Sequence, residues 1–224
     1  MPTLRKIIKS KDRVRDQGEV FTPPRIVKDM LDMVGDDIYD KTKRILEPTC
    51  GDGNFLVEIL QRRLDKIPRK LKIEEKEFEV LSILSNIYGI DIMQDNIIEA
   101  RSRLAGIVHT FFSESRNSSD FLTAANTIIE RNIVRGDSLK HKSKIKILEW
   151  VPVPGIKGFE INPHTLSQIE NDRKDIVIAT SISEINNVVN EIFSLKIPPK
   201  INSRPRKISK SQNSLFDIQV GELR

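Results

Sequence analysis

The stretch LEPTCGDGNFL, residues 46–56, decides the fold of this chain. The apolar run 44–47 predicts a buried strand, and the spacing of apolar residues over 54–64 predicts a helix. The loop between them contains Gly51 and Gly53, which accept positive φ angles and let a ligand approach the backbone closely. N–H groups at a helix start favour an anionic group. The stretch therefore predicts a ligand-binding loop, with a glycine turn that binds nothing as the alternative.

Further strand–helix units lie on both sides of this stretch. Downstream, residues 86–91 predict a strand and 95–104 a helix that could extend toward 117, and 132–135 predict a third strand. Upstream, 18–24 form a loop before a helix over 26–34, because two prolines oppose helix before them and permit it after. The charged stretch 65–76 is expected to be a surface loop leading into a helix over 78–84. Repeated units of this kind predict an α/β fold with a doubly wound, mostly parallel sheet.

The pattern weakens after Leu139. Residues 150–158, with two prolines and two glycines, are expected to be irregular, within an insertion spanning about 140–172. A fourth strand is expected over 175–179 and a helix over 185–193. The expected organisation is a basic N-terminal arm (1–17), one domain (18–195) and a disordered basic tail (196–224).

Charge is unevenly distributed along the 224 residues. Residues 1–17 carry a net charge of +4, residues 196–224 carry +5, and the remaining 178 residues carry −4. Basic arms suit a polyanion such as DNA, because neutralised phosphates release counterions, but they would also suit solvated, disordered ends. The one cysteine, Cys50, excludes an internal disulfide or a cysteine-built zinc site, and no metal site is expected. No apolar run is long enough to cross a membrane, and no secretory signal is expected.

Three other strings accompany the glycine loop in a fixed order. GEVFTP at 18–23 places Thr22 at a helix start, where it could also serve as a simple N-cap. YGIDI at 88–92 ends a strand in Asp91, an acceptor for ribose hydroxyls, although a solvent-facing aspartate is the alternative. IVRGDSL at 133–139 ends a strand in Asp137.

Together these strings resemble motifs X, I, II and III of the adenine-specific (N6) DNA methyltransferases. The resemblance covers roughly residues 18–139 and implies a Rossmann-like class I methyltransferase domain that binds S-adenosylmethionine. In the family, motif X helps to hold the methionine end of the cofactor, motif II the ribose and motif III the adenine amino group. The cofactor-binding residues so implied are Thr22, Glu47, Pro48, Cys50, Gly51, Gly53, Phe55, Asp91, Ile92, Asp137 and Ser138.

The catalytic loop of that family, Asn/Asp-Pro-Pro-Tyr/Phe after the fourth strand, has no recognisable counterpart. In that loop, the Asn side chain and a proline carbonyl accept hydrogen bonds from the target amino group, and the aromatic ring stacks on the flipped base. The catalytic residues are therefore unknown. The candidates are Thr180 and Ser181 after the expected fourth strand, and Asn162 in a degenerate Asn-Pro-His string.

The resemblance favours a DNA adenine methyltransferase homologue of restriction-modification or phage type, acting on double-stranded DNA in the cytoplasm of a bacterial or phage-infected cell. Without the loop or a target-recognition domain, it would be a split subunit completed by a second methyltransferase or recognition subunit, or a truncated product. The alternative is a non-catalytic subunit that binds the cofactor or tethers DNA. Methylation of RNA or protein is disfavoured by the form of motif I.

One string in the tail points to another partner. QNSLF at 212–216 resembles the short peptide by which bacterial proteins dock on the replicative sliding clamp. Leu215 and Phe216 would be the apolar anchors and Gln212 a directional hydrogen-bonding group. The alternative is that this pair folds back onto its own domain.

Overall fold

The computed structural model describes residues 7–112, 117–169, 178–194 and 218–219. The sequence candidates Gln212, Leu215 and Phe216 lie outside these residues, as does most of the 196–224 tail.

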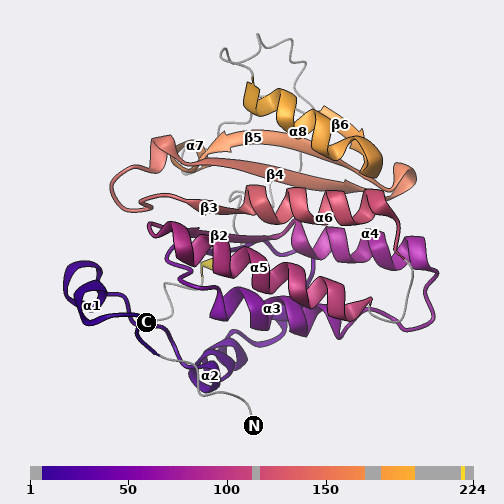
Figure 1. The fold of residues 1–224 in the computed structure, drawn as a ribbon. Coiled ribbons are helices and arrows are strands. Elements are labelled where there is room, and N and C mark those ends of the chain that lie inside the picture. The colour runs from indigo at the N-terminus through magenta and orange to yellow at the C-terminus, as the bar shows by residue number, and fades with distance from the viewer. Residues whose placement is uncertain (1–6, 113–116, 170–177, 195–217, 220–224) are drawn as a thin grey trace.

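A parallel sheet forms the centre of the fold (Figure 1). Its order is β3-β2-β1-β7, from strands β1 (Ile45–Glu47), β2 (Ile87–Asp91), β3 (Ile133–Arg135) and β7 (Ile218–Gln219). Glu47 lies opposite Gly89, and Asp91 lies opposite Arg135. The carboxyl ends of the strands therefore meet at one edge of the sheet, which is where ligands bind in open α/β sheets.

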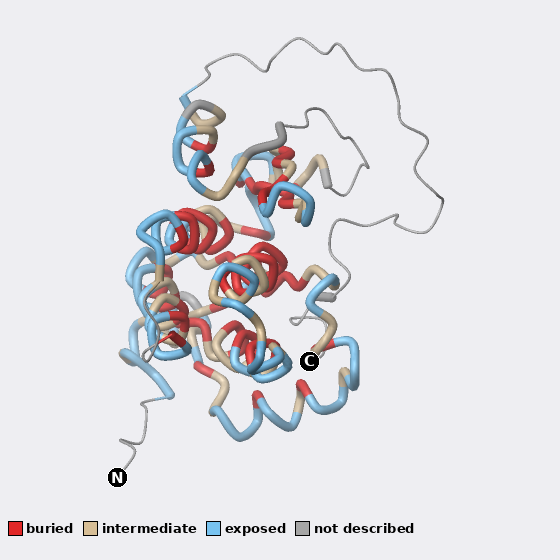
Figure 2. The backbone as a smooth tube through the Cα atoms, turned by 90° about the vertical axis from the view of Figure 1, so that its right-hand side faces the viewer, coloured by how far each residue is buried: buried red, intermediate tan, exposed pale blue. Residues whose placement is uncertain are grey.

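Two helices carry the chain away from this edge after β1 and β2. These are α3 (Asn54–Leu64) and α5 (Gln94–Phe111), which pack against each other. Each buries an apolar face, with Phe55, Leu56 and Ile59 in α3 and Ile97 and Leu104 in α5. Helix α5 extends past residue 104 as expected, but it ends before 117. Figure 2 shows the buried faces of the helices turned inward and their exposed faces outward.

Two helices differ from the sequence expectation. Helix α4 (Ile73–Leu84) begins five residues before Phe78, inside the stretch expected to be a loop. Its start is stabilised by Glu75, whose carboxylate accepts a hydrogen bond of 3.0 Å from the backbone N–H of Lys72. Helix α6 (Ser119–Asn132) was not predicted; Ser118 caps it, and its buried face includes Phe121 and Ile128.

The region expected to be irregular is an antiparallel sheet. Strands β4 (Lys146–Val153) and β5 (Gly158–Thr165) pair along their full length, and β6 (Ile178–Ser181) pairs with β5. The prediction for 150–158 was wrong, because side chains on this hairpin fill the core despite the two prolines: Trp150 and Phe159 are fully buried. Strand β6 is therefore not a fourth parallel strand beside β3.

The remaining elements are short or peripheral. They are α1 (Lys11–Gln17), α2 (Pro24–Val34), α7 (Leu166–Ile169) and α8 (Ile185–Ser194), with 3-10 turns η1 (Gly35–Tyr39), η2 (Lys142–Lys144), η3 (Pro154–Ile156) and η4 (Ile182–Glu184). Helix α8 packs on α6 beside the antiparallel sheet. No helix in the described part of the chain is long and apolar enough to cross a membrane.

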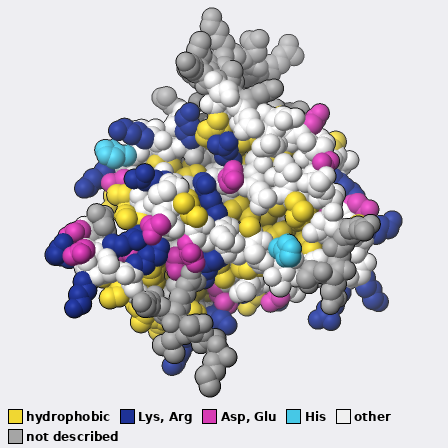
Figure 3. Space-filling model, viewed as in Figure 1, with side chains coloured by type: hydrophobic (Ala, Val, Ile, Leu, Met, Phe, Trp, Pro, Cys, Tyr) yellow, Lys and Arg dark blue, Asp and Glu magenta, His cyan; other side chains and the backbone are white. Residues whose placement is uncertain are grey.

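The N-terminal arm is folded over residues 7–17. Helix α1 is capped by Ser10, and Gly18 ends it in the left-handed conformation. Lys9 and Arg13 form ion pairs with Asp95 of α5 at 2.8 and 2.7 Å. For these residues, the structure does not show the alternative of a solvated, disordered end. Figure 3 shows Lys and Arg side chains gathered on the left of the molecule, over α1 and the connection between β3 and β4.

Candidate functional site

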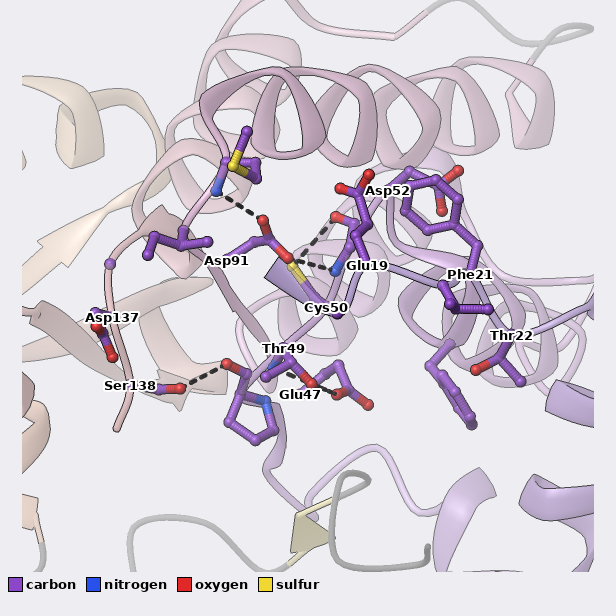
Figure 4. Close-up of a pocket in the computed structure, with 18 of the residues that line it drawn as sticks. Glu19, Phe21, Thr22, Glu47, Thr49, Cys50, Asp52, Asp91, Asp137 and Ser138 are labelled. Atoms are coloured by element: carbon purple, nitrogen blue, oxygen red, sulfur yellow. Dashed lines mark hydrogen bonds between the residues drawn. The ribbon is translucent and has the colours of Figure 1, made fainter. Parts of the chain in front are cut away.

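A cavity of about 390 Å³ lies at the carboxyl ends of β1, β2 and β3. Its size falls within the range of small-molecule sites, roughly 300–1,000 Å³. Four segments line it: residues 18–22, 47–55 without Gly53, 91–93 and 136–140. Figure 4 shows Thr22 and Phe21 on one side, Asp137 and Ser138 on the other, and Asp91 with Cys50 between them. The four strings singled out in the sequence thus meet around one cavity.

The loop after β1 takes its shape from two glycines. Gly51 has φ +53° and Gly53 has φ +86°, both in the left-handed region. A Cβ atom on Gly51 would lie 3.1 Å from the ring of Phe21, and one on Gly53 would lie 3.0 Å from the Cβ of Ala100. Gly53 is the N-cap of α3. The loop can therefore lie close to its neighbours and present the start of α3 to the cavity.

Asp91 at the end of β2 connects two parts of the cavity wall. One carboxylate oxygen, Oδ2, accepts from the backbone N–H of Gly51 at 3.0 Å, and Oδ1 accepts from that of Met93 at 2.8 Å. These bonds hold the carboxylate at the rim of the glycine loop. Each carboxylate oxygen can accept more than one hydrogen bond, so the group retains capacity for a ligand hydroxyl.

Asp137 and Ser138 form the opposite wall, after β3. Asp137 Oδ1 accepts from the backbone N–H groups of Lys140 at 2.8 Å and Leu139 at 3.0 Å. These bonds lower the pKa of the Asp137 carboxyl group, the one from Lys140 most strongly. Ser138 Oγ donates to the backbone carbonyl of Pro48 at 2.8 Å. The wall is thereby fixed to the loop after β1.

Thr22 and its neighbours close the cavity from the N-terminal side. Asn54 Nδ2 donates to the backbone carbonyl of Thr22 at 2.9 Å, which joins this segment to the start of α3. The N-cap of α2 is Pro23, without a side-chain cap, so the alternative of Thr22 as an ordinary N-cap is not what the structure shows. Glu19 lies in the same wall (Figure 4) and was not singled out from the sequence.

Two buried groups at the base of the cavity have restricted chemistry. Glu47 is 2% exposed, and its carboxylate accepts from the backbone N–H and hydroxyl of Thr49. Burial raises the pKa of the Cys50 thiol well above its ordinary value, and the nearby Asp91 raises it further. A protonated, buried thiol is a packing group rather than a nucleophile.

Ten of the eleven expected cofactor residues line the cavity, and Gly53 shapes the loop from just outside it. The other lining residues were not named as cofactor residues from the sequence: Gly18, Glu19, Val20, Phe21, Thr49, Asp52, Asn54, Met93, Gly136, Leu139 and Lys140. All but Met93 and Lys140 belong to the four strings, so membership of a string is the signal that could have found them.

The catalytic candidates do not line this cavity. Thr180 pairs with Phe159 in the antiparallel sheet, and Ser181 Oγ contacts Ser183 and Glu184. Asn162 is 6% exposed in β5 and donates to Glu149 at 2.9 Å. The fourth strand of the parallel sheet, beside β1, is β7, whereas the expected fourth strand over 175–179 overlaps β6 of the antiparallel sheet.

Comparison with known proteins agrees with this geometry. Residues 5–99 match the family described as N-6 DNA methylase. The N-terminal part of this chain is therefore similar in sequence to N-6 DNA methylases. A relative, the type II methyltransferase M.VspI of Vibrio sp. (strain 343), is 29% identical over 115 residues. That alignment covers 51% of this chain and 23% of the relative, so the chain matches less than a quarter of that protein's length.

No group of three or more His, Cys, Asp or Glu residues within the described ranges is placed to hold a metal ion.

Proposed function

We propose that the cavity binds S-adenosylmethionine and that this chain is the cofactor-binding part of a DNA adenine methyltransferase with a Rossmann-like class I fold. The observation that carries the proposal is the meeting of Asp91, Asp137 and the glycine loop around one cavity. Asp91 would accept from the ribose hydroxyls, Asp137 from the adenine amino group, and the start of α3 would face the methionine carboxylate. Ile92, 41% exposed beside Asp91, would contact the adenine ring.

The bound cofactor would supply a methyl group on a sulfonium, which is already activated for transfer to the 6-amino group of adenine. The protein therefore has to position two reactants rather than provide a strong base. The residues described here would hold the donor. They include no aromatic–proline loop for the acceptor base.

Strand β7, rather than β6, is the fourth strand of the parallel sheet that borders the cavity. Ile218 pairs with Ile45 and Gln219 with Leu46 in parallel register, so the carboxyl end of β7 lies at the same edge of the sheet as that of β1. Ser181 leads instead into η4 and α8, which pack on α6. Residues 220–224 lie outside the described part of the chain. The catalytic roles of Thr180, Ser181 and Asn162 stay predictions.

The connection between β3 and β4 supports double-stranded DNA as the partner. Five of the twelve residues from 135 to 146 are Lys or Arg, against the single acid Asp137. Lys140 lines the cavity, and neither Lys140 nor Lys144 forms an ion pair with a described residue. A surface of this kind fits phosphates next to the donor site.

A non-catalytic role remains the second candidate function. It is favoured by the position of β6, which carries Thr180 and Ser181 into the antiparallel sheet instead of to the cavity. A second methyltransferase or recognition subunit, a cytoplasmic location and docking of Gln212–Phe216 on a sliding clamp stay predictions.

The proposal is tested by titrating the full chain with S-adenosylmethionine in a calorimeter. We expect one site, weakened by about 1–3 kcal/mol in Asp91→Ala, because ribose hydroxyls would lose their acceptor. Asp36→Ala, at an exposed position in η1, is the matched control and should bind like the unaltered chain. Absence of binding at millimolar cofactor would contradict the proposal.

A further inference from the structure

Asn96 in α5 is a buried amide that contacts the cavity wall from behind. It is 1% exposed. Its Nδ2 donates to Glu19 Oε1 at 2.7 Å and to Asp91 Oδ1 at 3.2 Å, and its Oδ1 accepts from Lys9 Nζ at 2.6 Å. All three partners come from other elements: the arm, the loop after α1 and the end of β2.

These contacts leave one orientation for the amide. Lys9 has an ammonium group, which only donates hydrogen bonds, so it must face the amide oxygen. The NH₂ group then points to the two carboxylates, which only accept when ionised. Asn96 is therefore held with its two N–H bonds divided between Asp91 and Glu19.

The arrangement matters because two carboxylates share one wall of the cavity. Asp91 and Glu19 both line it, and like charges placed close together repel each other. A neutral double donor between them gives each carboxylate a hydrogen bond without adding charge. Arg13 supports the same wall, with Nε 2.8 Å from Glu19 Oε2.

The N-terminal arm completes the network. The carboxylate of Asp95, next to Asn96, accepts hydrogen bonds from Lys9 Nζ and from both terminal nitrogens of Arg13, with donor–acceptor distances of 2.7–2.9 Å. The backbone N–H of Phe21 donates to the carbonyl of Ile7 at 2.8 Å, so the arm also pairs with the segment that lines the cavity. The charged groups around Asn96 are Lys9 and Arg13 of the arm, Glu19 of the loop, Asp91 of β2 and Asp95 of α5.

We propose that Asn96 is a positioning residue of the cofactor site, which keeps the carboxylates of Asp91 and Glu19 in place at the cavity wall, with its amide fixed by Lys9 of the N-terminal arm. This inference rests on the proposed binding of S-adenosylmethionine. It adds to that function a role for residues 7–17, which do not line the cavity themselves.

The deciding variants are Asn96→Ala and Asn96→Asp, compared by cofactor titration between about pH 5.5 and pH 8, where an ordinary carboxyl group is ionised. Asn96→Ala removes both donors and should weaken binding about tenfold at every pH. Asn96→Asp keeps the shape but places a third carboxylate between two others, which raises its pKa. Its binding loss should be about tenfold or more at pH 8 and shrink as the pH falls, because a protonated carboxyl group can donate again.

Three controls separate positioning from general stability. Asn190→Ala, at an exposed position in α8, should leave affinity unchanged. Asp95→Asn loosens the arm but keeps both N–H contacts of Asn96, so its affinity loss should be clearly smaller than that of Asn96→Ala. Thermal unfolding without cofactor checks that each variant folds.

Equal losses in Asn96→Asp at all pH values, or losses in Asp95→Asn as large as in Asn96→Ala, would overturn the proposal. So would affinity in the Asn96 variants equal to that of Asn190→Ala. Failure of the unaltered chain to bind the cofactor is a different result, because it would contradict the proposed function itself.

Discussion

Two clusters of polar residues distinguish the two sheets of this molecule. At the carboxyl edge of the parallel sheet, Asp91 and Asp137 face an open cavity. Beside the antiparallel sheet, Glu149 is 2% exposed and contacts Arg44 at 3.0 Å, Asn162 at 2.9 Å and His164 at 3.5 Å. The groups of the second cluster contact one another in the interior, whereas those of the first line a space that a ligand can enter. Polar residue type alone does not separate a binding site from a structural cluster; access does.

The sharpest way to break this comparison is Glu149→Ala. The change removes the carboxylate that Arg44 and Asn162 contact, and breaking a buried ion pair costs about 3–5 kcal/mol. We expect the urea midpoint to fall accordingly, while molecules that remain folded keep their cofactor affinity. Glu160→Ala, on the neighbouring strand, should change the free energy of unfolding by less than about 0.5 kcal/mol. A stable Glu149→Ala protein that no longer binds the cofactor would show that the two clusters are not separate in role.

A glycine pair tests the shape of the cavity loop with a smaller effect. Gly53→Ala forces a side chain into the left-handed region at φ +86°, with its Cβ 3.0 Å from Ala100, and should destabilise the fold by about 1–3 kcal/mol. Gly106→Ala is the same change inside α5, where nothing lies within 4 Å of the added Cβ. It should stabilise the protein by about 0.5–1 kcal/mol. Thermal unfolding measures the change in stability of each variant. A change of the same sign in both would contradict the role given to the left-handed backbone of Gly53.

The arm gives the smallest effect, because Asp95 is about half exposed. Hydrogen bonds from Arg13 and then Lys9 hold the pKa of the Asp95 carboxyl group far below its usual value. A depressed pKa in the folded state stabilises the protein above the ordinary carboxyl pKa, and this stabilisation is lost as the pH falls through the depressed value. Asp95→Asn should therefore cost up to about 1 kcal/mol at pH 7 and progressively less below about pH 4. The urea midpoints of Asp95→Asn and of the unaltered chain, compared at pH 7 and below about pH 4, measure this loss of stability. A loss that grows as the pH falls would contradict the role given to the Asp95 carboxylate.

The parallel part of the fold could be predicted because its signals are local. The loop at residues 46–56 contains its own strand end, glycines and helix start, and Asp91 and Asp137 end strands of the same kind. Their convergence follows from the rule that parallel strands end at one edge. Ten expected residues accordingly line one cavity.

The antiparallel part could not be predicted because its stability depends on contacts distant in sequence. Trp150 donates from its indole nitrogen to Asn132 at 2.8 Å, and Phe159 packs on Phe78. The prolines and glycines at 150–158 indicated irregular backbone, but core packing of the hairpin outweighs them. The pairing of Ile218 with Ile45 in the neighbouring strand could not be predicted from the local sequence pattern either. Asn96 carried no motif, because its role depends on Lys9, 87 residues away.

The measurement that tests the central claim most directly is amide hydrogen exchange of the whole chain with and without S-adenosylmethionine. The account predicts slower exchange in the cofactor-bound protein at residues 18–22, 47–55, 91–93 and 136–140, which line the cavity. Residues 146–165 of the antiparallel hairpin should exchange at the same rate in both states. Protection confined to the hairpin, or no protection anywhere at saturating cofactor, would contradict it.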